Sequence, residues 1–244
     1  MRAQFAAEAA RLMYEENVAE YFRAKRIAAK RILGRAGGWR LRYHPRDLPS
    51  NGEIRDARLL LAELAEGSRR TERLFAMRVI ALETMRAIPT LCPRLIGSVS
   101  TGHIRRGSDI DVQVFADGPE AVEKRLTSLG WTFDPVRTTI HKGGKVREYQ
   151  HYHVADVFPI ELTLYEKREL RVRPRSSTDG KPIQRMTVSA LETRLMREHT
   201  KPWQRYLETG EIEGLDTWLT EEEQPRPGPF DGLLAAVEPE AASS

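Results

Sequence analysis

Two carboxylates, Asp109 and Asp111, stand one residue apart, and a glycine-serine pair, Gly97-Ser98, precedes them with ten residues between. Side chains two residues apart on a β-strand point to the same face, so Asp109 and Asp111 are predicted to project together. Two adjacent carboxylates repel each other unless a cation lies between them. Mg²⁺ is commonly bound by a few carboxylates together with the phosphates of a substrate. The spacing therefore predicts a site for divalent cations and a polyphosphate.

Groups that bind phosphate are predicted around these aspartates. Gly97 allows the backbone to turn sharply and to approach a phosphate closely. Ser98 adds a hydroxyl donor, and backbone N–H groups in such turns form anion-binding concavities. Basic residues in the same span and in a later loop near residues 179–180 are candidates for neutralising the charge of a triphosphate, although a solvated turn explains that loop equally well. The predicted nucleotide-binding residues are Gly97, Ser98, Arg105, Arg106, Ser108, Lys181 and Arg185.

This pattern resembles the signature of the polymerase-β-like nucleotidyltransferase superfamily. The resemblance rests on Gly97-Ser98, the ten-residue spacing and Asp109-Ile110-Asp111, and it covers residues 94 to 165. Gly102 agrees with it as the second glycine of the loop. Thr101 departs from it, because many small members of the superfamily carry a basic residue there. The family resemblance implies an α+β fold with a polymerase-β-like core, that is, a mixed β-sheet flanked by helices.

The resemblance also implies a reaction and a third carboxylate. The reaction is attack by an acceptor hydroxyl on the α-phosphorus of a nucleoside triphosphate, with release of pyrophosphate and with two Mg²⁺ ions, or Mn²⁺ in their place. Glu161 is the preferred third carboxylate, because residues 160–165 alternate and put Glu161 opposite the apolar face. Asp156 is the alternative. Asp109, Asp111 and Glu161 are therefore the predicted catalytic and metal-binding residues.

The elements that position these residues follow from periodicity. Residues 1–90 are predicted as an N-terminal helical region packing on the core, with a capping box at Ser50 and Glu53 and an inward stripe that ends at Leu64. Residues 91–200 are predicted as the catalytic core, including a helix over 118–129, a hairpin around residues 143–144 and a helix over 187–198. Residues 201–220 form a C-terminal extension, and residues 221–244 are predicted to be an acidic, disordered tail.

The charge distribution bears on the acceptor. Residues 207–244 contain one basic and ten acidic residues, a net charge of −9. Because the whole chain has a net charge of +4, the preceding 206 residues have a net charge of +13. Nine basic and no acidic residues lie between Arg23 and Arg46, which suggests contact with a nucleic acid. An RNA end, for example of a transfer RNA, is the favoured acceptor. A protein that receives AMP, a small molecule, and a catalytically silent nucleotide- or RNA-binding regulator are the alternatives.

Three further observations limit the function classes. Cys92 is the only cysteine, which excludes an internal disulfide and is typical of a reducing cytoplasm. The sequence contains neither an apolar run long enough for a membrane span nor the apolar core of a signal peptide, so no membrane partner is expected. His151 and His153 share one face of a predicted strand, and we interpret them as partly exposed histidines instead of metal ligands.

Overall fold

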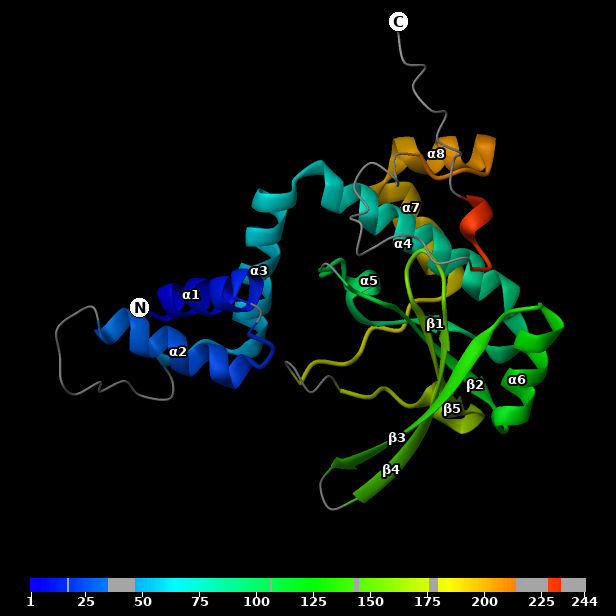
Figure 1. The fold of residues 1–244 in the computed structure, drawn as a ribbon, viewed down its shortest axis with the longest axis horizontal. Coiled ribbons are helices and arrows are strands. Elements are labelled where there is room, and N and C mark those ends of the chain that lie inside the picture. The colour runs from blue at the N-terminus through cyan, green and yellow to red at the C-terminus, as the bar shows by residue number, and fades with distance from the viewer. Residues whose placement is uncertain are drawn as a thin grey trace, which may run out of the picture. The chain divides into compact units, whose positions relative to one another are not determined.

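The computed structural model describes residues 1–16, 18–34, 47–105, 107–142, 145–175, 180–213 and 228–233. The chain divides into two units (Figure 1). The first comprises the described residues of Met1–Arg70 and Pro174–Ile183, and the second those of Thr71–Arg173 and Gln184–Ser244. The helical region predicted over residues 1–90 is thus shared between the units, with the boundary at residue 70.

Three helices make up most of the first unit: α1 (Arg2–Glu15), α2 (Tyr21–Gly34) and α3 (Asn51–Glu66). They share a small core that includes Leu12, Ala28 and Ile54. The predicted capping box is confirmed, because Ser50 Oγ accepts a hydrogen bond from the Glu53 N–H and the Glu53 carboxylate accepts one from the Ser50 N–H. The inward stripe predicted for α3 is wrong at its end, since the side chain of Leu64 is 76% exposed.

A mixed five-stranded sheet organises the second unit. Its spatial order is β1 (Arg94–Leu95), β2 (Ile110–Ala116), β5 (Ile160–Glu166), β4 (Lys145–Val154) and β3 (Phe133–Lys142). β2 and β5 are parallel, and the other neighbours are antiparallel. β5 pairs only with Gln150–Val154 of β4, so the far part of the β3–β4 hairpin extends beyond the sheet.

Helices cover one face of this sheet. Ile110, Val112 and Val114 of β2 are buried in one core with residues of α4 (Ser68–Ala87), α6 (Pro119–Ser128), α7 (Val188–Glu198) and α8 (Thr200–Thr209). Short elements complete the unit: α5 (Gly97–Thr101), η2 (Pro89–Leu91), η3 (Lys167–Arg171) and η5 (Asp231–Leu233). Alternation along β2 directs Asp111 to the opposite face, away from this core.

The coarse prediction of an α+β fold is confirmed: the described residues form a five-stranded mixed sheet flanked by helices. None of the helices in the described part of the chain combines the length and apolarity needed to cross a membrane. The predicted tail lies outside the described residues except for 228–233, and so do residues 35–46 of the basic run.

Candidate active site

Two of the predicted carboxylates are neighbours across the parallel strands. Asp111 on β2 is the register partner of Glu161 on β5. Both lie on the sheet face that the helical core leaves uncovered. Asp109 precedes the first residue of β2 and belongs to the incoming turn, one residue outside the strand. The fold therefore gathers all three predicted carboxylates at one end of the β2–β5 pair.

Electrostatic repulsion among these carboxylates is largely uncompensated. Burial, with the charges of Glu161 and then Asp109 added, raises the pKa of Asp111 to about 7. Burial and the charge of Glu161 also raise the pKa of Asp109, and interactions with His153 and Arg105 offset this only in part. A group of carboxylates that resists ionisation is one that a divalent cation would stabilise.

Gly97 is in close contact with this group. Its φ of 71° lies in the left-handed region, and a Cβ atom at this position would overlap the carboxylate of Asp111. Glycine is therefore required here for two reasons, backbone conformation and space. Gly97 is the first residue of α5, and its exposed backbone lies beside Asp111, with Ser98 half-buried next to it.

Two arginines hold α5 in place through its carbonyl groups. Arg78 on α4 has a side chain only 1% exposed, and its Nε donates to the Val99 carbonyl at 3.2 Å. Its Nη1 donates to Glu198 Oε2 at 2.7 Å. Arg194 on α7 donates to the Ser100 carbonyl at 2.8 Å. The backbone that carries Gly97 is thus fixed by charged groups on two core helices.

His151 on β4 orients the third carboxylate. Its Nδ1 lies 2.7 Å from Glu161 Oε1, and Nδ1 carries the hydrogen because an ionised carboxylate only accepts. Thr163 Oγ1 donates to the same oxygen at 3.2 Å. His151 is partly exposed, as predicted, but that interpretation did not include this contact. The register that places β4 beside β5 creates it, and no local sequence pattern carries that register.

Asp156, the alternative third carboxylate, lies elsewhere. It is 2% exposed, and its carboxylate accepts hydrogen bonds from the backbone N–H groups of Val157 and Phe230, both at 2.8 Å. Gly228 packs directly on the same loop. Asp156 therefore attaches residues 228–230 to the loop before β5, whereas Glu161 is the residue brought beside Asp111.

The predicted phosphate-binding residues separate into two groups. Arg105 remains exposed near Asp109, and the Ser108 hydroxyl accepts a hydrogen bond from the Arg105 N–H, which fixes the turn before Asp109. Arg185 is committed elsewhere. Its guanidinium donates to Gln113 Oε1 and to the Val172 carbonyl, both at 2.6 Å, and lies over the Phe115 ring.

Two predicted residues remain. Lys181 is exposed and belongs to the first unit. Arg106 lies outside the described residues.

The donor set agrees with divalent cations that prefer oxygen. Asp109, Asp111 and Glu161 provide carboxylate oxygens only, which suits Mg²⁺ and Mn²⁺ better than thiophilic metals. Among the described residues, no group of three or more His, Cys, Asp or Glu side chains is already arranged to hold a metal ion. The fit rests on donor chemistry, on the raised pKa values and on the glycine that makes room for the Asp111 carboxylate.

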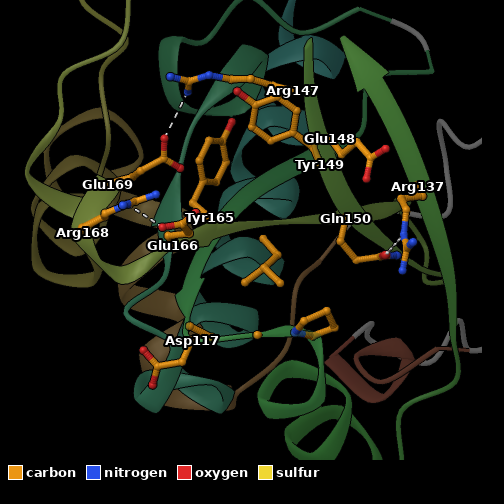
Figure 2. A pocket seen from close by; sticks show the side chains of 14 residues that line it. Asp117, Arg137, Arg147, Glu148, Tyr149, Gln150, Tyr165, Glu166, Arg168 and Glu169 are labelled. Carbon is orange, nitrogen blue, oxygen red and sulfur yellow. Dashed lines mark hydrogen bonds and ion pairs between the residues drawn. The ribbon is translucent and has the colours of Figure 1, made fainter. Parts of the chain in front are cut away.

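A separate pocket of about 610 Å³ lies at the other end of the same strands (Figure 2). Its lining includes Ala116 and Glu166, five residues along β2 and β5 from Asp111 and Glu161, or roughly 17 Å at the rise of a strand. Two of its arginines are paired, Arg147 with Glu169 and Arg168 with Glu166. None of the predicted catalytic residues lines this pocket.

Comparison with protein-family models, with curated proteins and with solved structures finds no match to this chain. The class that can be stated is therefore structural. The protein has an α+β fold in which a mixed sheet carries three acidic side chains at one end of its parallel strand pair.

Proposed function

We propose that this protein is a nucleotidyltransferase of the polymerase-β-like type, which moves a nucleoside monophosphate from a nucleoside triphosphate to an acceptor hydroxyl. The observation that carries the proposal is the pairing of Asp111 with Glu161 across β2 and β5, with Asp109 beside them and Gly97 against Asp111. An arrangement of exposed structural acids would not need a glycine at that position.

Each residue has a distinct role in the proposed reaction. Asp109, Asp111 and Glu161 hold two divalent cations, Mg²⁺ or Mn²⁺. When bound, these cations neutralise the triphosphate and make the acceptor hydroxyl easier to deprotonate. The exposed backbone at Gly97 and Ser98 accommodates the triphosphate, and Arg105 adds positive charge at the same edge. Positioning and charge stabilisation supply most of the rate enhancement in such a site.

The direct test is transfer of label. Purified protein and an Asp109→Asn/Asp111→Asn variant are incubated with each α-³²P-labelled nucleoside triphosphate, Mg²⁺, total cellular RNA and a protein extract. We expect label on RNA with the wild-type protein alone. Label on a protein band would identify the AMP-transferring alternative. Binding of nucleotide without any transfer, with Mg²⁺ and with Mn²⁺, would contradict the proposal and favour a silent regulator.

His151 should affect the same site through Glu161. His151→Ala removes the 2.7 Å hydrogen bond, and loss of a partner that orients a metal-binding carboxylate typically costs about 10- to 100-fold in metal affinity or activity. Mn²⁺ binding followed by electron paramagnetic resonance gives the affinity without turnover, and transfer assays give kcat and KM. His151→Asn retains an amide N–H near the position of Nδ1 and should recover most of the loss. Equal impairment in both variants would mean that the imidazole ring only fills space.

A further inference from the structure

The second helix presents a stripe of exposed cations. Arg23, Arg26 and Lys30 on α2 are exposed and follow the spacing i, i+3 and i+7, which places them on one face of the helix. Within the described residues, none of the three forms an ion pair with an acidic side chain. At the rise of an α-helix, the stripe is about 10 Å long. α2 itself contains no acidic residue.

Another arginine of the same helix does form ion pairs with acidic side chains. Arg31 lies on the side toward α1 and forms ion pairs with Glu16 at 2.6 Å and with Glu8 at 3.3 Å. The acids of α1 therefore neutralise one side of α2 and leave the stripe of Arg23, Arg26 and Lys30 without such partners in the described chain. The positive charge of α2 is therefore concentrated on the face that carries this stripe, and the ion pairs of Arg31 do not neutralise it.

An exposed aromatic ring adjoins the stripe. Phe22 is 71% exposed, and the guanidinium of Arg26 lies 5.8 Å from its ring centroid. The buried face of α2 is formed by Ala24, Ala28 and Ala29, so Phe22 contributes nothing to the helix core. A ring that lies in solvent beside Arg26, at one end of the stripe, suits stacking against a nucleobase, with the cations on the neighbouring phosphates.

We propose that the α2 face formed by Phe22, Arg23, Arg26 and Lys30 binds single-stranded RNA. The inference rests on the proposed function only in that this RNA is the acceptor, and binding itself requires no turnover. An acidic protein would also be attracted by the cations. The solvent-exposed ring favours RNA, because bases offer flat surfaces and acidic side chains do not.

Fluorescence anisotropy with a labelled single-stranded RNA of mixed sequence tests the surface in the full-length protein. The logarithm of affinity is measured against the logarithm of salt concentration between about 50 and 200 mM. Each phosphate contact to a single strand contributes about 0.7 to the slope, so Arg23→Gln/Arg26→Gln/Lys30→Gln should lower the slope by about 2. Phe22→Ala should weaken binding by about 5- to 150-fold and leave the slope unchanged.

Two controls match these variants. Arg23→Lys/Arg26→Lys keeps the charges and should keep the slope. Lys124→Gln/Arg171→Gln/Lys201→Gln removes three exposed charges from the second unit and should also keep it. The proposal would be overturned if Arg23→Gln/Arg26→Gln/Lys30→Gln kept the slope of the wild type, or if the triple variant in the second unit lowered the slope by the same amount. Polyglutamate is also tested as a competitor of the RNA. If it competes, and if this competition depends on the three cations but not on Phe22, the proposal is overturned in favour of binding to an acidic protein.

Failure here and failure of the proposed function give different results. RNA binding that requires α2 without any nucleotidyl transfer would count against the transferase and support the surface. Nucleotidyl transfer to RNA that is unchanged by the α2 substitutions would support the transferase and count against the surface.

Discussion

Replacing Asp111 by asparagine is expected to abolish nucleotidyl transfer and, at the same time, to stabilise the protein in the absence of divalent cations. The first effect follows because the variant loses one of the carboxylates that would hold the proposed cations. The second follows because burial and the charge of Glu161 raise the pKa of Asp111 to about 7, so its ionised form destabilises the folded state. Each unit of such a shift corresponds to about 1.4 kcal/mol. Asparagine keeps the shape of the side chain and removes its charge.

Thermal unfolding in EDTA and in Mg²⁺ measures both consequences for stability. We expect the melting temperature of Asp111→Asn in EDTA to rise by several degrees, given about 2–4 °C per kcal/mol for a domain of this size. We also expect Mg²⁺ to stabilise the wild type and to have little effect on the variant. Asp117→Asn is the matched control, because Asp117 follows the other end of β2 and pairs with Lys167. A lower melting temperature of Asp111→Asn in EDTA would contradict the interpretation of the acidic group.

Arg78→Met is expected to be among the most destabilising single substitutions in the second unit. Removing one partner of a buried ion pair typically costs about 3–5 kcal/mol, because the remaining groups stay desolvated and unpaired. Here the Val99 carbonyl loses its donor, and α5 loses one of the two arginines that bind its carbonyls. Glu198 keeps its ion pairs with Arg197 and Arg194, so we expect a cost toward the lower end of this range. Transfer activity should therefore decrease even at temperatures where the variant remains folded.

Chemical denaturation measures this cost. Arg86→Met is the control on the same helix, because Arg86 pairs with Glu83 and Glu192 on the surface, where ion pairs contribute at most about 1 kcal/mol. Arg78→Lys restores a charge but not the fork of donors, and it should recover only part of the stability. If Arg78→Met and Arg86→Met lower the free energy of unfolding by the same amount, the hydrogen bonds of Arg78 at α5 are not what stabilises this unit.

Local patterns were sufficient for the strands and for the acidic group. The alternation of Ile160, Leu162 and Leu164 predicted β5 and the face of Glu161, and the register with Asp111 agrees with it. The conformational freedom of glycine predicted a turn at Gly97, and the structure adds a second requirement, the absence of a Cβ atom against Asp111. These features are encoded within a few residues of the chain, so sequence alone reveals them.

Features that depend on distant partners could not be predicted. The hydrogen bond of His151 to Glu161 arises from the pairing of β4 with β5, which no local periodicity specifies. The hydrogen bonds of Arg185 to Gln113 and to the Val172 carbonyl were likewise not predicted, and its role toward a triphosphate stays a prediction. A long cationic side chain reaches many acceptors within its length, and only the fold decides among them. The residues 35–46 that extend the basic run lie outside the described part of the chain.

The parallel pairing of β2 with β5 also determines when the group of three carboxylates is assembled. Asp111 and its register partner are fifty residues apart in the chain, with α6 and the whole β3–β4 hairpin between them. Helices and hairpins close quickly because their contacts are local, whereas a long-range parallel pair must first pay the entropy of closing a large loop. During synthesis, the ribosome releases both aspartates well before Glu161 emerges. A growing chain therefore acquires its complete set of carboxylates only after most of the sheet has been made, and refolded protein should recover its helical signal before it recovers the proposed transfer activity.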